Sequence, residues 1–117
     1  MIATADIGNA IADLLQQQWS GTRIVELEAA ERVSPAAIAA AFSRALGKPV
    51  RAEAVPREQW EAIFREQGMH NPLPRMQMID GFNQGWIDFA DKGANACKGS
   101  VSIEAAIAAL VEGNTSA

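Results

Sequence analysis

The segment from Met69 to Phe89 holds the densest set of side chains that could bind a small molecule. At helical spacing, its large apolar residues fall on one stripe: Met78, Ile79, Phe82, Trp86 and Phe89. A Met-rich aromatic surface with a few amides, such as Asn83 and Gln84, suits a flat aromatic ligand. A plain hydrophobic core is the commoner use of the same pattern. Both interpretations, pocket wall and core, therefore stay open at this point.

Two polar residues in this segment also have a chemical interpretation. His70, in a loop beside a cleft, could act as a general acid, and Arg75 could bind a phosphate or carboxylate through two hydrogen bonds. A solvated histidine and an arginine that flanks a helix are the commoner outcomes. Gly81 and Gly85, four residues apart, predict that a second element packs closely against the helix backbone.

Missing motifs limit the chemistry that this chain can perform alone. The sequence has no G-x-G-x-x-G, no G-x-x-x-x-G-K-[ST] and no G-x-S-x-G, and it has no tyrosine at all. Cys97 beside Lys98 could be an activated nucleophile, but a free thiol in a loop is the simpler interpretation. One His and one Cys do not make a usual zinc site. We therefore predict no catalytic residue and no metal ligand.

The elements that must position these residues are five helices and two strands. We expect a helix over residues 5–18 with Thr4 as N-cap, a strand over 23–28, and a helix that begins at Ser34-Pro35 and ends at Gly47. A second strand over 50–55 would make a βαβ unit with parallel strands. The fold class predicted is α/β and mostly helical, with a short two-stranded parallel sheet.

The rest of the chain reads as helical apart from two connectors. A helix begins at Pro56 and closes at Gly68, residues 69–74 form an irregular connector because of their two prolines, and a helix covers 75–90. A polar loop over 91–99 leads to a last helix capped by Ser100 or Ser102. Residues 1–112 are expected to form one domain and 113–117 a frayed tail. A two-stranded sheet is not stable alone, so we expect a subdomain with an exposed edge.

Composition excludes several classes of partner. The 117 residues carry a net charge of −4, and their basic side chains are scattered singly, so a nucleic-acid partner is not expected. No apolar run approaches the length of a membrane span, and residues 1–20 do not resemble a secretory signal. The expected location is the cytoplasm.

Several motifs, taken in order, resemble the C-terminal, substrate-side portion of the NmrA-like NAD(P)-binding family, which is of the atypical short-chain dehydrogenase kind. The resemblance is greatest to its quinone-reductase-like members. The matching segments are Thr4-Ala5-Asp6-Ile7-Gly8 with Leu14-Leu15, Ile24-Val25-Glu26-Leu27, Val33-Ser34-Pro35, Ala45-Leu46-Gly47-Lys48-Pro49-Val50, Val55-Pro56 with Trp60, and Gly68 through Phe89. The resemblance covers nearly the whole chain.

This resemblance implies a Rossmann-type protein whose nucleotide-binding half is not in this chain. NADP(H) would be held by that half, and this chain alone would bind no cofactor. Its own part would be substrate binding for hydride transfer to a small aromatic or quinone-like compound. The residues implied to line the substrate side are Asn71, Pro72, Met78, Phe82 and Trp86.

A second hypothesis is a stand-alone small-molecule-binding or self-assembling module descended from that family. Such a module would bury the surface left by the missing half in a homo-oligomer, most simply a dimer. Met1 stands directly before the T-x-D-I-G-like segment, so we expect the reading frame to begin there. That favours the second hypothesis for this molecule and the first for its ancestry.

Overall fold

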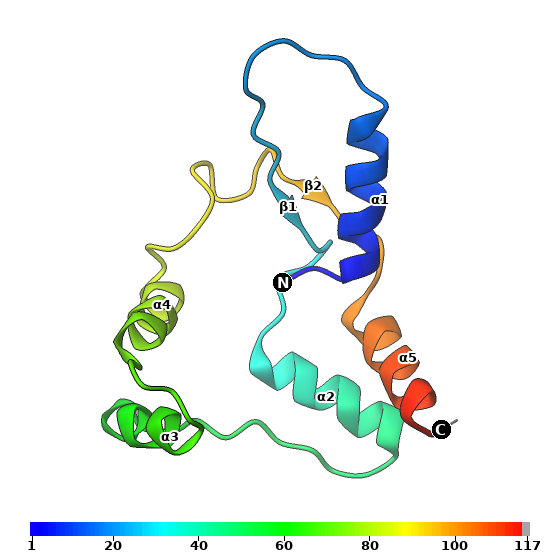
Figure 1. Ribbon diagram of the computed structural model, residues 1–117. Helices are drawn as coiled ribbons and strands as arrows, with labels where there is room; N and C mark the ends of the chain where they lie inside the picture. The colour runs from blue at the N-terminus through cyan, green and yellow to red at the C-terminus, as the bar shows by residue number, and fades with distance from the viewer. Residues whose placement is uncertain (116–117) are drawn as a thin grey trace. The chain divides into compact units, whose positions relative to one another are not determined.

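The computed structural model describes residues 1–115, which form two compact units. Unit 1 combines Met1–Ala52 with the chain from Ala94 onward, and unit 2 is Glu53–Gly93. Figure 1 traces both units along the chain. The prediction of one domain over residues 1–112 stays a prediction.

Unit 1 brings the two ends of the sequence together. It contains α1 (Thr4–Leu15), β1 (Leu27–Glu28), α2 (Pro35–Leu46), β2 (Cys97–Lys98) and α5 (Ile103–Thr115). Helices α2 and α5 lie side by side (Figure 1). Their buried residues are Ala39 and Ala41 on α2 and Ile107 on α5. Small residues allow close approach of the two helices, so this core is thin and rests on few large side chains.

Helix α2 confirms its sequence signals at both ends. The Ser34 hydroxyl accepts a hydrogen bond from the Ala37 N–H at 3.2 Å, and Pro35 occupies the first turn. Gly47 ends the helix with a φ of 65°, a left-handed conformation that glycine adopts without steric cost. The chain then folds back, because the Ser43 hydroxyl donates to the Val50 carbonyl and accepts from the Val50 N–H.

The sheet is parallel and two-stranded, as predicted, but its second strand is not the predicted one. β1 pairs with β2 in the register Leu27 to Cys97 and Glu28 to Lys98. Residues 50–55 form no strand, and β2 lies instead in the segment 91–99 that we expected to be a loop. The prediction was wrong because the Ser43 hydroxyl takes both backbone groups of Val50, whereas distant side chains hold β2 beside β1.

Unit 2 is helical throughout its ordered elements. A 3₁₀ helix η1 (Arg57–Gln59) leads into α3 (Trp60–Glu66), and α4 (Leu73–Gln84) follows a short connector. Helix α4 begins two residues before the predicted start because the first turn of a helix tolerates Pro74, which needs no hydrogen-bond donor there. It ends at Gly85, whose φ is 81°, rather than at residue 90.

The other two helices differ from prediction mainly at their ends. Helix α1 ends at Leu15 rather than at 18, and its N-cap is Ala3, with no side-chain capping bond, rather than Thr4. Ser102, not Ser100, caps α5, because its hydroxyl accepts from the Ala105 N–H. Helix α5 continues to Thr115, past the predicted start of the tail, and 116–117 lie outside the described residues. None of the helices formed by residues 1–115 has the length and apolar character needed to cross a membrane.

Candidate functional site

The five residues implied to bind substrate all lie in unit 2, but they are not equally accessible. Met78 and Phe82, one turn apart on the same side of α4, are 47% and 61% exposed. Trp86, just beyond the helix, is 63% exposed, and Asn71 is exposed in the connector. Pro72 is less than 2% exposed and therefore presents no surface to a ligand in this structure.

Gly81 fixes the position of Trp86 next to α4. The Gly81 carbonyl accepts hydrogen bonds from the backbone N–H groups of Gly85, Trp86 and Ile87. A methyl group at Gly81 would overlap the Ile87 and Trp86 side chains, so the close neighbour at this glycine is the segment directly after α4 and not the predicted second element. At Gly85 such a group would meet nothing within 4 Å. The indole N–H donates to the Gln84 side-chain oxygen at 3.2 Å. Trp86 is thus held beside the helix without belonging to it, and Phe89 also lies outside α4.

Ionic contacts within unit 2 hold α4 in place. The Arg57 guanidinium donates two bonds from different nitrogens to Asp80 on α4, at 2.9 Å and 2.5 Å. These bonds lower the pKa of the Asp80 carboxyl and raise that of Arg57. Asp80 is therefore an ion-pair partner of Arg57.

Two further polar residues of this segment have structural contacts. The Arg75 guanidinium lies 5.0 Å from the centre of the Phe64 ring, and Arg75 lies in the first turn of α4 rather than flanking the helix. His70 is exposed, and its backbone carbonyl accepts a bond from Arg65. Neither contact assigns a catalytic role.

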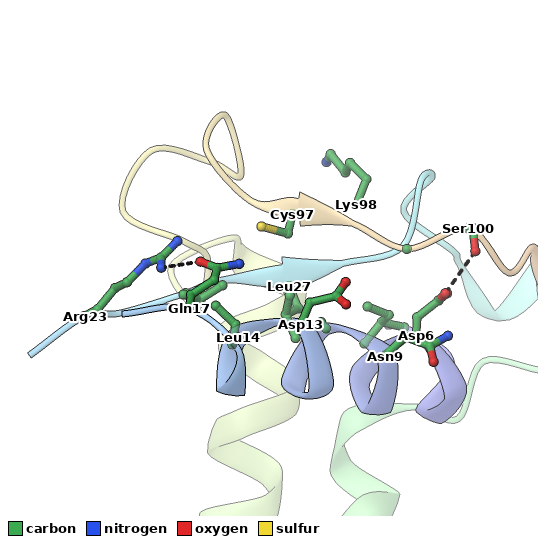
Figure 2. Close-up of a pocket in the computed structure, with 14 residues that line it drawn as sticks. Asp6, Asn9, Asp13, Leu14, Gln17, Arg23, Leu27, Cys97, Lys98 and Ser100 are labelled. Carbon is green, nitrogen blue, oxygen red and sulfur yellow. Dashed lines mark hydrogen bonds between the residues drawn. The ribbon is translucent and has the colours of Figure 1, made fainter. Parts of the chain in front are cut away.

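Unit 1 contains a separate cavity of about 340 Å³ between α1 and the strands. Figure 2 shows Asp13 and Leu14 of α1, and Gln17 just after it, pointing toward β1 and β2. Apolar and polar side chains both line the cavity. The lining residues are Ile2, Asp6, Asn9, Ala10, Asp13, Leu14, Gln17, Arg23, Val25, Leu27, Cys97, Lys98, Gly99 and Ser100. None of the five predicted site residues lines this cavity.

Asp6 closes one end of this cavity and ties α1 to the segment before α5. Its carboxylate accepts from the Val101 N–H at 3.0 Å and from the Ser100 hydroxyl at 3.1 Å (Figure 2 shows the latter). The hydrogen bonds from the Val101 backbone and then from Ser100 lower the pKa of Asp6. Asp6 is only 7% exposed, and a side chain at Gly99 would collide with its carboxylate. Its role is to bind two distant segments together.

A second carboxylate crosses the sheet. Glu28, 8% exposed, forms ion pairs with Lys98 on β2 and with Arg32 at 3.3 Å. The hydrogen bond from Lys98 is the main cause that lowers the pKa of Glu28. Lys98 is thus ion-paired with Glu28, and its neighbour Cys97 is an exposed free thiol.

The cavity was missed because its residues come from three separate segments. A signal did exist on α1, where Asp6, Asn9 and Asp13 recur at helical spacing and line the cavity as a polar stripe. The contribution of residues 97–100 had no local signal. Among residues 1–115, no three His, Cys, Asp or Glu side chains lie together as a metal site would require.

Comparisons with known proteins supply no relative for this arrangement. No protein-family model, no curated protein and no solved structure matches the chain.

Proposed function

We propose that this chain is the substrate-side portion of an NADP(H)-linked, quinone-reductase-like oxidoreductase that works together with a nucleotide-binding half. The observation that carries the proposal is the surface formed by Met78, Phe82 and Trp86, each about half or more exposed to solvent. Large apolar side chains on one segment usually leave water when a partner or ligand is present. The order of family-like motifs along the chain supports the same conclusion.

The chemistry of this surface fits a flat, weakly polar ring. Phe82 and the indole of Trp86 offer aromatic faces, and Met78 offers a polarisable thioether that adapts to the shape of its partner. Gln84 and Asn71 could donate hydrogen bonds to carbonyl oxygens at the rim of such a ring. The residues of this chain would bind and orient the acceptor, and we assign none of them a proton-transfer role.

NADP(H) does not fit the residues of this chain. A pyrophosphate site of the Rossmann kind needs a glycine-rich turn directly between a strand and an open helix N-terminus. Within residues 1–115 a helix follows a strand directly at two places, α2 after β1 and α5 after β2. The first turns of these helices are already capped by the Ser34 and Ser102 hydroxyls. The cofactor would therefore lie wholly on the other half.

Calorimetric titration with a small quinone, menadione, tests the proposal. Phe82→Ala removes most of an aromatic contact, worth about 1.5 kcal/mol or more if buried by ligand, so binding should weaken roughly tenfold. Leu73→Ala is the matched control, since Leu73 is 55% exposed on the same helix but is not part of the proposed surface. Equal affinities of the two variants would contradict the proposal. Saturable binding of NADPH to the chain alone would contradict the placement of the cofactor site.

A self-assembling module is the alternative, and α1 favours it. Ile11 and Leu15 lie one turn apart on α1 and are both at least half exposed, so they form an apolar strip in unit 1. A second copy could cover this strip. Sedimentation velocity at micromolar concentration distinguishes the two cases: a dimer that Leu15→Lys converts to monomer supports the alternative, and a folded monomer contradicts it.

A further inference from the structure

One edge of β1 is paired and the other is open. On the paired edge, the Glu26 and Glu28 carbonyls accept from the N–H groups of Cys97 and Gly99 at 2.8 and 2.7 Å. Peptide groups of successive residues in a strand point to opposite edges. Val25 and Leu27 therefore direct their N–H and C=O groups to the other edge, where neither has a hydrogen-bond partner within residues 1–115. Such an edge is a template for another strand.

The direction of the missing strand follows from Met1. Ala29, the next residue that faces the open edge, donates its N–H to the Met1 carbonyl at a long 3.4 Å. Figure 1 shows α1 running away from the N-terminus and β1 returning toward it. A strand that leads into Met1 would thus lie parallel to β1, with α1 as the crossover helix of a βαβ unit. Hydrogen bonds between parallel strands are evenly spaced, so the carbonyl of the second residue before Met1 would accept from the Leu27 N–H.

The cavity in unit 1 indicates which side chains such a strand would need. Ile2 lines the cavity with Leu14, Val25 and Leu27, whereas Met1 does not. Side chains alternate along a strand, so every second residue of an added strand, in phase with Ile2, would point at these apolar lining residues. Apolar residues at those positions would fill the space that now lies open there.

We propose that the open edge of β1 is a docking site for a parallel strand with apolar residues at alternate positions. The strand would come from the nucleotide-binding half, an assignment that rests on the proposed function. A second copy of β1 fits less well, because a closed two-fold dimer requires antiparallel strands. Centred on Val25, that pairing would set Ile24, 85% exposed, opposite the Glu26 carboxylate of the other copy.

A tethered strand provides the test. The full chain is extended before Met1 by three Thr-Val repeats, which place Val in phase with Ile2. The matched control carries three Val-Thr repeats, which have the same composition but turn Thr toward the cavity. Amide hydrogen exchange is then followed by NMR at Val25 and Leu27, with Glu28, whose N–H faces β2, as internal reference.

In the Thr-Val protein, exchange at Val25 and Leu27 should slow by about tenfold, as expected for one added hydrogen bond each, and Glu28 should not change. The Val-Thr protein should show a smaller effect. Unchanged exchange at Val25 and Leu27 would overturn the proposal. Protection of these amides in the unextended chain that grows with its concentration would also overturn it, in favour of a second copy. Menadione titration of the same samples distinguishes the docking site from the proposed function. Protection of Val25 and Leu27 without quinone binding would contradict only the proposed function.

Discussion

The side-chain contacts inside unit 1 and those inside unit 2 span very different distances along the chain. In unit 1, the side-chain contacts that join its elements link residues 60 to 95 positions apart, from Arg44–Glu104 to Asp6–Val101. In unit 2, the contact between Arg57 and Asp80 links residues only 23 positions apart. Closing a long loop costs more chain entropy than closing a short one, though the cost grows only slowly with length. Unit 1 therefore depends on a few distant contacts, and unit 2 on local ones.

The largest effect that this comparison predicts comes from Asp6→Ala. The substitution removes the acceptor of the Val101 N–H and the Ser100 hydroxyl, and leaves a partly buried backbone donor unsatisfied. We expect the melting temperature to fall by several degrees, and amides of α1 and α5 to exchange faster in hydrogen-exchange mass spectrometry. Amides of α3 and α4 should keep their protection. Loss of protection in both units together would show that they unfold as one.

Gly81→Ala is expected to have a somewhat smaller destabilising effect, and in unit 2 instead of unit 1. The added methyl group overlaps Ile87 and Trp86, and overpacking of this kind costs about 1–3 kcal/mol. Here only unit 2 should lose protection, and the emission of Trp86 should shift as its ring moves. Gly113→Ala is the control, because a methyl group there meets nothing within 4 Å. If unit 1 amides also exchange faster in Gly81→Ala, the comparison between local and distant contacts fails.

Acid should act on unit 1 through Asp6 and Glu28. Their pKa values are lowered in the folded protein, by the hydrogen bonds from Val101 and from Lys98 respectively. Folding therefore gains stability that is complete above the ordinary carboxyl pKa of about 4 and is lost as pH falls through the lowered values. Thermal melts between pH 7 and 2.5 should show this loss, and Asp6→Asn should reduce its steepness. A variant that melts with the same pH dependence as the unchanged chain would exclude Asp6 as a source.

The smallest effect is expected from Asp80→Asn in unit 2. The Asp80 side chain is 18% exposed, but the Arg57 side chain is 55% exposed, so water competes for the guanidinium and the ion pair contributes little. An amide can still accept one bond from Arg57. A drop in melting temperature as large as that of Asp6→Ala would mean that unit 2 depends on this ion pair, which would reverse the comparison.

The same difference decides what the sequence could predict. Helix α2 was predicted because Ser34, Pro35 and Gly47 act within a few residues of the backbone that they cap. The partner of β1 was not, because residues 97–98 carry no strand pattern of their own and are placed by Asp6 and Glu28 from the other end of the chain. Helix α4 was predicted with errors at both ends, since Pro74 and Gly85 each permit two local structures.

The candidate surface shows a similar division. Phe82 and Met78 are exposed and so are not part of a hydrophobic core, one of the two alternatives that spacing alone left open, and the pocket wall stays a prediction. The stripe was extended too far, since Trp86 and Phe89 lie beyond the left-handed Gly85. Pro72 could not be recognised as buried, because its burial depends on packing that a short motif does not encode.

The order of elements in unit 1 has a consequence for biosynthesis. Glu28 and its partner Lys98 are 70 positions apart, and all of unit 2 is translated between them. At bacterial and eukaryotic elongation rates of about 5–20 residues per second, β1 leaves the ribosome roughly 4 to 14 s before β2. Unit 2 can complete its local contacts during that interval. β1 meanwhile stays open on both edges, and a chaperone that shields short apolar strands would have its longest opportunity to bind there.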